Sequence, residues 1–411
     1  MTGTGPHPSY ASLRSIQRAL VATTELLATE LGRPGDVAPR WSAFEWRVAR
    51  AVAAIHGISP LLSEKLRWQG APGWQRFLRE QRAHTAARHL RSLGLLQQID
   101  AAGRHAGVAA LALKGPELFS RGLYARGQRP MADIDLLIHR DDARGATRML
   151  ESIGFQEMLA TPRHRIFVPT QPRVPAGLGE HADNDLKVEV HERITEALPI
   201  AAADITAEVF PSQPVAGLNR YPSRAALMSH LTLHAAGAMR ARALRMLHLH
   251  DLALLSAGMS AADWQEFLER RAQDAGHRWA LPPLVLTGRY YAAVIPAEVI
   301  AALALRCPKL LKAISRRRTL TAVSLSHLWI DAFPGIEWSR STSEAVRYVA
   351  TRICPDAKML ELRREVTEAH VPAAATEWNR LSQGRRVLRW LWSRQPRADT
   401  LHAVRLALES R

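Results

Sequence analysis

A short run of alternating apolar and acidic residues constrains the fold of this chain more than any other feature. The run reads Ala132-Asp133-Ile134-Asp135-Leu136, and apolar residues continue to Ile138. Side chains two apart on a strand point to the same side, so Asp133 and Asp135 would share one face. Two carboxylates this close raise each other's proton affinity unless a cation lies between them. A divalent metal such as Mg²⁺ would resolve the conflict; an edge strand with both acids in solvent is the alternative.

The segments around this strand predict a small α/β unit. The apolar run VAALALKG ends at Lys114-Gly115-Pro116, which is typical of a buried strand followed by a turn, and a helix is expected to follow through Leu118, Phe119 and Tyr124. Two alternating segments, 163–168 and 186–191, indicate a hairpin. The loop between them, residues 169–185, is too long for a tight turn and is expected to be mobile.

Helical spacing dominates on both sides of that unit. Residues 74–103 form a long helical pattern expected to break at Gly103 and Gly107, and a strong pattern resumes from Pro222. The chain has 411 residues, of which 47% are hydrophobic, so two or three domains with a sizeable core are possible. The order predicts an α+β, mostly helical fold, in which a small mixed β-sheet core is flanked by N- and C-terminal helical regions. The expected division is an N-terminal helical region over 1–105, the α/β core over 106–216 and a C-terminal helical region over 217–411.

A third acid could complete a metal site. Glu189 lies between Val188 and Val190 on a later predicted strand. If that strand neighbours the Asp133 strand, three carboxylates converge, and such a cluster can hold two Mg²⁺ ions against a nucleoside triphosphate. The helix that begins at Gly115 would point backbone N–H groups at the phosphates, and Lys114 would add a positive charge there.

Together these motifs resemble the nucleotidyltransferase superfamily of the DNA polymerase β type. Within it, the chain resembles a large family of bacterial nucleotidyltransferase-like proteins. The resemblance spans roughly residues 40–260 and is dense between 111 and 193. It rests on the following matches: Leu113-Lys114-Gly115, Arg129-Pro130-Met131-Ala132-Asp133-Ile134-Asp135-Leu136-Leu137, Gly154-Phe155, Glu189-Val190-His191, and then His230, His234 and Asp251.

The resemblance implies a metal-dependent nucleotidyltransferase with Mg²⁺, or Mn²⁺, as cofactor. Asp133, Asp135 and Glu189 would be the catalytic and metal-binding residues. A nucleotide would pass from NTP, with ATP expected, to a hydroxyl of an unidentified acceptor, and pyrophosphate would be released. A small molecule, a peptide, a protein or an RNA all remain open as that acceptor. The chain departs from better-known members at Pro116, where they carry a phosphate-binding serine after the glycine.

Several other polar residues are candidates for the site. Arg129 and Lys187 would bind nucleotide phosphates together with Lys114 and Gly115, although a surface arginine and a lysine that only balances the acids are the alternatives. His191 and His234 would orient the acceptor or act as a base, whereas hydrogen-bonded structural histidines are the competing interpretation. His230 and His234 lie four apart, so they share a helix face, which we interpret as packing against the α/β unit.

The formal net charge of +17 favours an anionic partner. Arginine clusters occur at 240–245, at 316–318 and at 385–389, the last of them followed by Trp390 and Trp392. They could bind nucleic acid, but solvated helix faces are the alternative. A non-catalytic protein that binds a nucleotide or a partner on the same fold is a further possibility.

The sequence also bears on location. Cys307 and Cys354 are the two cysteines, and they form neither a disulfide framework nor a zinc-binding spacing. The first fifteen residues lack the basic and apolar stretches of a signal peptide, and no run of 18 apolar residues is present. We therefore expect a cytoplasmic protein without a membrane span.

Overall fold

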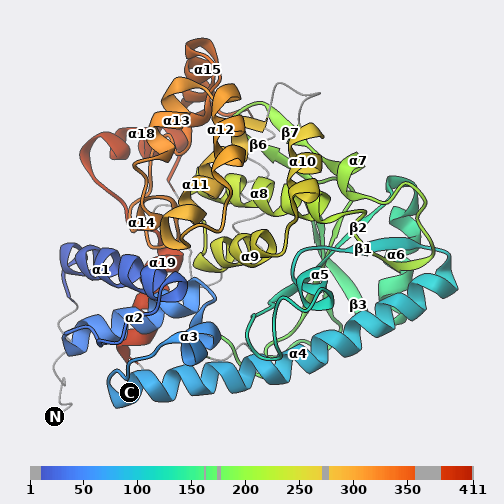
Figure 1. Cartoon of the computed structure of the whole chain (residues 1–411), viewed down its shortest axis with the longest axis horizontal. Coiled ribbons are helices and arrows are strands. Elements are labelled where there is room, and N and C mark those ends of the chain that lie inside the picture. Colours follow the sequence, from blue (N-terminus) through green and yellow to red (C-terminus); the bar gives the residue numbers. More distant parts are fainter. Residues whose placement is uncertain (1–10, 162, 174–176, 271–276, 357–380, 410–411) are drawn as a thin grey trace.

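A mixed six-stranded sheet with the strand order β3-β4-β5-β2-β1-β8 lies at the centre of the α/β part of the chain (Figure 1). The structure is a computed structural model that describes residues 11–161, 163–173, 177–270, 277–356 and 381–409. The first ten residues, on which part of the expected absence of a signal peptide rests, and residues 174–176 of the predicted loop lie outside this range. The strands of the sheet are β1 (Ala109–Ala112), β2 (Asp133–Ile138), β3 (Phe155–Ala160), β4 (Arg165–Pro169), β5 (Lys187–His191) and β8 (Gly217–Asn219), and a separate ribbon pairs β6 (Thr195–Ala197) with β7 (Ala202–Asp204).

Helices make up most of the rest of the described chain, so the predicted α+β, mostly helical fold is confirmed. The N-terminal helices are α1 (Leu13–Gly32), α2 (Ala43–Ile55), α3 (Ser59–Lys65) and α4 (Pro72–Ala106). Those between the strands are α5 (Gly115–Ser120), α6 (Ala143–Ser152) and α7 (Thr206–Val209). The C-terminal ones are α8 (Arg224–Arg240), α9 (Met246–Ala257), α10 (Ala261–Glu269), α11 (Leu281–Tyr290), α12 (Ala297–Arg306), α13 (Lys309–Ser315), α14 (Leu320–Val323), α15 (Thr342–Ile353), α18 (Gln383–Trp392) and α19 (Ala398–Glu409). None of the described helices is long and apolar enough to cross a membrane.

The long helix α4 connects the N-terminal helices to the sheet. In Figure 1 this helix runs along the lower side of the sheet. It begins with Pro72 in its first turn, where the missing N–H costs nothing, and ends before Gly107, whose φ of 68° suits a left-handed cap. The sequence predicted a break at Gly103, but the helix continues through it. A Cβ at Gly103 would lie 3.1 Å from the Cα of Gly217, so this glycine lets β8 approach the helix closely.

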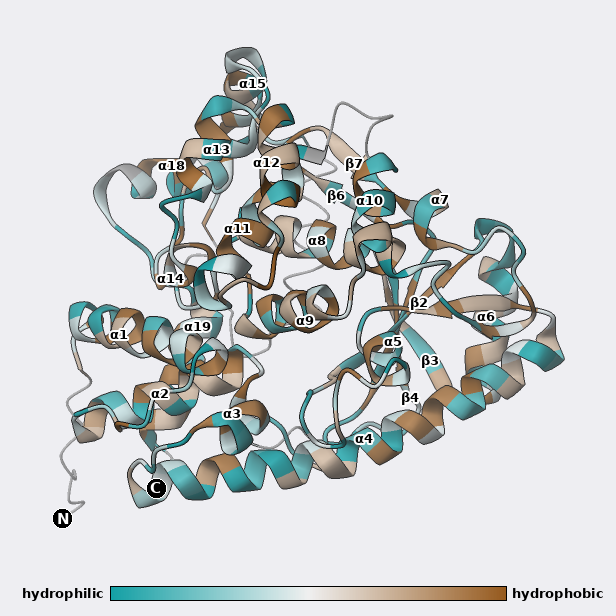
Figure 2. Ribbon diagram, in the orientation of Figure 1, coloured by the Kyte–Doolittle hydropathy of each residue, from teal (hydrophilic) through white to brown (hydrophobic). Residues whose placement is uncertain are grey.

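The two faces of the sheet pack against different surroundings. Ile134, Leu136 and Val188 belong to a buried cluster with residues of α4 and α6. The alternate residues, Asp133, Asp135 and Glu189, point to the opposite face because side chains alternate along a strand. Figure 2 shows hydrophobic stretches along the strands and on the helices that surround the sheet. The alternation therefore buries the apolar half of β2 and leaves its two acids on the face turned toward the C-terminal helices.

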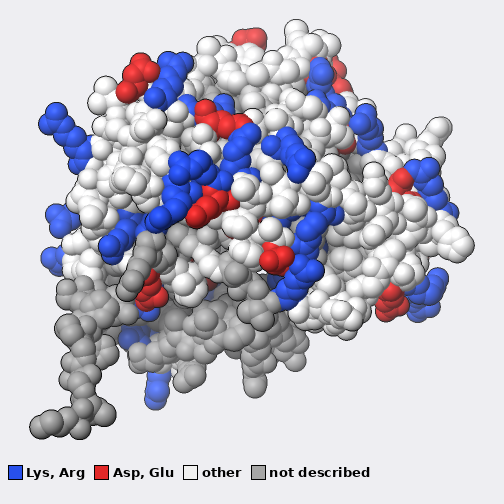
Figure 3. Space-filling view, turned by 90° about the horizontal axis from the view of Figure 1, so that it is seen from below, with Lys and Arg blue, Asp and Glu red and all other residues white. Residues whose placement is uncertain are grey.

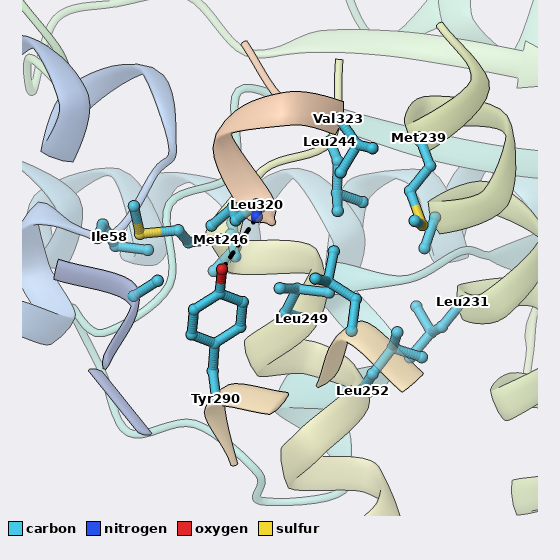
Figure 4. Close-up of a cluster of buried hydrophobic side chains, with 14 of the residues drawn as sticks. Ile58, Leu231, Met239, Leu244, Met246, Leu249, Leu252, Tyr290, Leu320 and Val323 are labelled. Atoms are coloured by element: carbon cyan, nitrogen blue, oxygen red, sulfur yellow. Dashed lines mark hydrogen bonds between the residues drawn. The ribbon is translucent and has the colours of Figure 1, made fainter. Parts of the chain in front are cut away.

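A second and larger core fills the helical part. Figure 4 shows one portion of it, where Leu249 and Leu252 of α9 pack beside Met246 and Leu320. Tyr290 ties this core to the N-terminal helices: its hydroxyl accepts a bond from the Leu320 N–H at 2.9 Å and donates one to Glu25 at 2.6 Å. At the other end of the chain, α19 packs against α2, so the two termini of the fold lie together (Figure 1).

The tryptophans of the N-terminal region pack against one another. The ring of Trp46 lies 4.8 Å from that of Trp41, 6.1 Å from Trp68 and 5.8 Å from Trp74. These separations are typical of aromatic pairs in protein interiors. The indole N–H of Trp68 donates to Glu30 at 2.9 Å, which satisfies its buried polar group.

Three local predictions were wrong. Helix α5 ends at Ser120 and does not reach Tyr124, because the chain turns through Gly122 at a φ of 70°. The long helical pattern after Pro222 is interrupted between α8 and α9. The interruption contains Arg242, which has a φ of 57° and is buried in ion pairs with Asp331 and Glu337.

The third is the loop over residues 169–185, which was expected to be mobile. Its described part is fastened to α4: Glu180 forms an ion pair with Arg88, and the Glu180 N–H donates to Gln81 at 2.7 Å. The rings of His84 and His181 stack with centroids 4.6 Å apart. Helix α4 thus holds the described part of the loop through Gln81, His84 and Arg88.

Candidate active site

Strands β2 and β5 run parallel and side by side, which places the three predicted acids on one face. Asp135 lies opposite Glu189, and Asp133 lies opposite Lys187, in the register of the two strands. Glu189 is therefore adjacent to the aspartates in space although more than fifty residues separate them in sequence. Within the described part of the chain, however, the group of three potential ligands whose donor atoms all lie within 4.8 Å of one another is His164, Glu189 and His191. The three carboxylates face the same cavity but stand farther apart than that.

The side chains of Lys114 and His191 hold the carboxylate of Asp135. The Lys114 ammonium lies 2.8 Å from its Oδ2, and the Nε2 atom of His191 lies 3.0 Å from its Oδ1. Burial by itself would raise the pKa of Asp135, but Lys114 and His191 outweigh it and hold this pKa well below its usual range. Asp135 raises the pKa of Lys114 in return, against the effect of burial. Asp135 is thus ionised and Lys114 charged at neutral pH.

The other two acids are less well compensated. Burial raises the pKa of Asp133, and the charge of Asp135 raises it further. Burial, followed by Asp135 and Asp133, raises the pKa of Glu189 to about 7. Lys114, Arg245 and Arg129 lower the pKa of Asp133, and Lys114 and Lys187 lower that of Glu189, but in neither case do they offset burial and the neighbouring acids. A bound cation would therefore favour the ionised form of both acids.

The backbone of Lys114 is held in an uncommon conformation beside the acids. Its φ is 55°, and its N–H donates to the Tyr221 hydroxyl at 3.2 Å. That hydroxyl also contacts Nδ1 of His230 at 2.7 Å. The Lys114 N–H is therefore already used, and Pro116 has no backbone N–H to donate. Helix α5 is also only six residues long, so the predicted phosphate-binding turn at Gly115 offers few free N–H donors.

Arg129, which was predicted to bind phosphate or pair with the acid cluster, forms a bidentate ion pair with Asp251. Its Nε lies 2.9 Å from Oδ1 and its Nη2 lies 2.7 Å from Oδ2 of that residue, and the Tyr124 hydroxyl donates to the same Oδ1 at 2.6 Å. Asp251 thus bonds to a residue 122 positions away in the sequence. The guanidinium still borders the cavity, but most of its donors are used within the protein.

Gly115 is required by this arrangement. A Cβ at this position would lie 2.6 Å from Nη1 of Arg129 and 2.8 Å from the sulfur of Met131. We expect Gly115→Ala to lower the free energy of unfolding by about 1–3 kcal/mol, because Asp251 prevents Arg129 from moving aside. Urea unfolding measures the change. Gly73→Ala, where a Cβ would meet nothing within 4 Å, is the control, and equal stability of the two variants would contradict the expectation.

A cavity of about 420 Å³ opens in front of the acids. Of the predicted residues, those in its lining are Lys114, Gly115, Arg129, Asp133, Asp135, Glu189 and His234. Lys187 shares the face of Glu189, but its side chain is exposed to solvent and does not line this cavity. His191 lies in the wall of a smaller neighbouring cavity of about 40 Å³, together with His230. His230 and His234 thus pack against the α/β unit, as interpreted from their spacing.

The sequence missed several residues of the site. Arg163, Arg240 and Arg245 line the cavity, as do Glu196 and His248. The ring of His248 lies 4.8 Å from that of His234, and burial holds the pKa of both histidines well below the usual value. Among these residues, only Arg240 and Arg245 belonged to a pattern noted in the sequence, the arginine cluster at 240–245. The sequence could not show that this cluster lies beside the three acids.

The arginine clusters do not form uniformly basic surfaces. Arg242 is buried with Asp331 and Glu337, and Arg318 also pairs with Glu337 at 2.8 Å. Trp390, which follows the third cluster, packs with Arg352 of α15, whose guanidinium carbon lies 5.6 Å from the centroid of its ring. On the face seen in Figure 3, Lys and Arg side chains are interspersed with Asp and Glu.

Comparison with known proteins identifies the family of this chain. Residues 42–290, more than half of the chain, match the model of a protein family described as uncharacterised nucleotidyltransferase. No curated protein and no solved structure matches the chain. The matched segment contains the whole sheet, the three acids, Lys114 and the Arg129–Asp251 pair. The chain therefore belongs to this family of uncharacterised nucleotidyltransferases.

Proposed function

We propose that the protein is a metal-dependent nucleotidyltransferase of the DNA polymerase β type, which transfers a nucleotide from NTP, with ATP as the expected donor, to an acceptor hydroxyl. The observation that carries the proposal is the pairing of β2 with β5, which sets Asp133, Asp135 and Glu189 on one face beside a cavity. The family supports nucleotidyl transfer in general. The acceptor, whether small molecule, peptide, protein or RNA, is left open.

The side chains present fit Mg²⁺ or Mn²⁺. Their donors are hard carboxylate oxygens, which these ions prefer. The raised pKa values of Asp133 and Glu189 indicate that further positive charge would be favourable there. Asp133, Asp135 and Glu189 would hold the ion, which when bound supplies neutralisation of the triphosphate charge.

The remaining steps belong to the chain's own residues. Lys114, Arg240 and Arg245 border the cavity and would hold the phosphates in position. The acceptor oxygen then forms a bond to the α-phosphorus while the bond from that phosphorus to the bridging oxygen breaks, and pyrophosphate leaves. Glu189, with a pKa of about 7, would accept the proton of the acceptor hydroxyl. Positioning and charge neutralisation supply most of the rate enhancement in such a reaction.

The test uses NTPs labelled at either the α- or the γ-phosphate. The protein is incubated with each nucleotide, Mg²⁺ and a cell extract, and the labelled products are identified. The proposal requires that α-labelled NTP labels the acceptor. It also requires that γ-labelled NTP leaves the acceptor unlabelled, because the γ-phosphate leaves in pyrophosphate. Transfer of the γ-label would show phosphoryl transfer, and no Mg²⁺-dependent labelling by any of the four NTPs would also contradict the proposal.

The rate of transfer should depend on pH through Glu189. The proton-accepting form is the carboxylate, so the rate should rise with pH through about 7, where Glu189 ionises. A bound dication favours the carboxylate, so the midpoint should fall as the Mg²⁺ concentration increases. A rate profile that is flat from about pH 6 to pH 8 would contradict this role.

One observation favours a second function, that of a nucleotide-binding protein without catalysis on the same fold. Lys114 and His191 already occupy both oxygens of Asp135, so the protein partly compensates this acid by itself. This alternative predicts Mg²⁺-dependent NTP binding without release of pyrophosphate in the presence of every acceptor tested.

A further inference from the structure

A cluster of two histidines and one glutamate lies beside the proposed nucleotide site. Strands β4 and β5 are antiparallel, with Ile166 opposite Glu189 and Arg165 opposite Val190. Extending this register by one residue brings His164 opposite His191, and their ring centroids are 5.2 Å apart. His164, Glu189 and His191 therefore share one face of two hydrogen-bonded strands, which fixes their relative positions.

The separations within this cluster suit a small metal ion. Nε2 of His164 lies 3.7 Å from Oε2 of Glu189, and Nε2 of His191 lies 3.9 Å from the same oxygen. Two ligand atoms that bind one tetrahedral Zn²⁺ stand about 3.4 Å apart, given metal–ligand distances near 2.1 Å. The two pairs that include Glu189 would thus need to contract by only a few tenths of an ångström, and all three donor atoms lie within 4.8 Å of one another. The side chains are 16–23% exposed, so an ion could reach them from solvent.

The charges nearby are compatible with such an ion. The two neighbouring cations are already paired: Arg163 contacts Glu196 at 2.6 Å, and Lys114 contacts Asp135 at 2.8 Å.

We propose that His164, Glu189 and His191 form a binding site for a divalent transition metal of the Zn²⁺ type, distinct in its donors from the carboxylate site for Mg²⁺. Imidazole nitrogens favour zinc-like ions, whereas Mg²⁺ prefers oxygen alone. The site has three protein ligands and leaves a fourth position open. Because Glu189 belongs to both sites, the two ions would compete. Zn²⁺ would also draw His191 away from Asp135.

Zn²⁺ binding to the full-length protein tests the proposal without nucleotide or activity. Titration calorimetry, together with the visible absorption of a Co²⁺-loaded sample, should show one high-affinity site per chain. His164→Ala and Glu189→Gln should each weaken Zn²⁺ binding by at least about tenfold, since even residues that only support metal ligands contribute that much. His139→Ala is the matched control, because this histidine is exposed and lies outside the cluster.

The outcomes are decisive in either direction. Weakened binding in both variants, with wild-type binding in His139→Ala and unchanged circular dichroism, supports the site. Equal Zn²⁺ affinity in the wild type and His164→Ala overturns it, because the ion would then bind elsewhere. Asp133→Asn should retain Zn²⁺ binding, so failure of the nucleotidyltransferase proposal would leave this result unchanged.

Discussion

Replacing Asp133 with Asn should abolish nucleotide transfer while leaving the fold intact. Asn has nearly the same shape but no charge, so it removes one of the three carboxylates that would hold the metal. A metal contributes several kcal/mol to the stabilisation of transition-state charge, and a loss of about 4 kcal/mol slows a reaction about a thousandfold. Pyrophosphate release measures the rate, and circular dichroism verifies folding.

Asp141→Asn is the matched control for this variant. Asp141 lies just after β2, and its side chain is 88% exposed, so its charge is far less important to the cavity. The control should retain the wild-type rate. If Asp133→Asn released pyrophosphate as fast as Asp141→Asn, the assignment of the acids to catalysis would fail. The non-catalytic alternative predicts the same absence of a difference in rate between the two variants.

Replacing Asp251 on α9 with Ala should cause a large loss of stability. The change leaves the Arg129 guanidinium buried without its bidentate partner and removes the acceptor of the Tyr124 hydroxyl. Breaking a buried ion pair by removing one partner costs about 3–5 kcal/mol. Urea unfolding followed by circular dichroism should therefore show a clearly lower midpoint.

Two further variants distinguish the loss of the buried Arg129–Asp251 ion pair from the general effect of removing a charge. Asp183→Ala breaks an ion pair with Arg173 whose side chains are 59% and 64% exposed, and it should cost less than about 1 kcal/mol. The double variant Arg129→Met and Asp251→Leu replaces both charges, so part of the lost stability should return. If Asp251→Ala were as stable as Asp183→Ala, the Arg129–Asp251 pair would not stabilise the contact between α9 and the segment that precedes β2.

The local sequence was enough to predict the chemistry of β2. The alternation of Asp133, Ile134, Asp135 and Leu136 requires opposite faces for acids and apolar residues in any extended strand. The same argument holds for Glu189 on β5, and the paired segments predicted the β4–β5 hairpin. These features depend only on neighbours along the chain, which the sequence displays directly.

Partners distant in sequence could not be predicted in this way. Arg129 carried the right charge for a phosphate, but the fold brings Asp251 against it, and a buried guanidinium pairs with the carboxylate it meets. His164 attracted no notice because its relation to His191 depends on the register between β4 and β5. The gap between α8 and α9 likewise reflects Arg242 pairing with residues about ninety positions away.

The sequence by itself determined that two strands carry acids on one face and that helices surround them, because strand alternation and helical spacing are local properties. Tertiary structure alone decided that β5 lies next to β2, that Lys114 and His191 hold Asp135, and that a second group of ligands forms around Glu189. The physical reason is that charges and hydrogen bonds act between atoms close in space. Which atoms are close is set by packing of the entire chain.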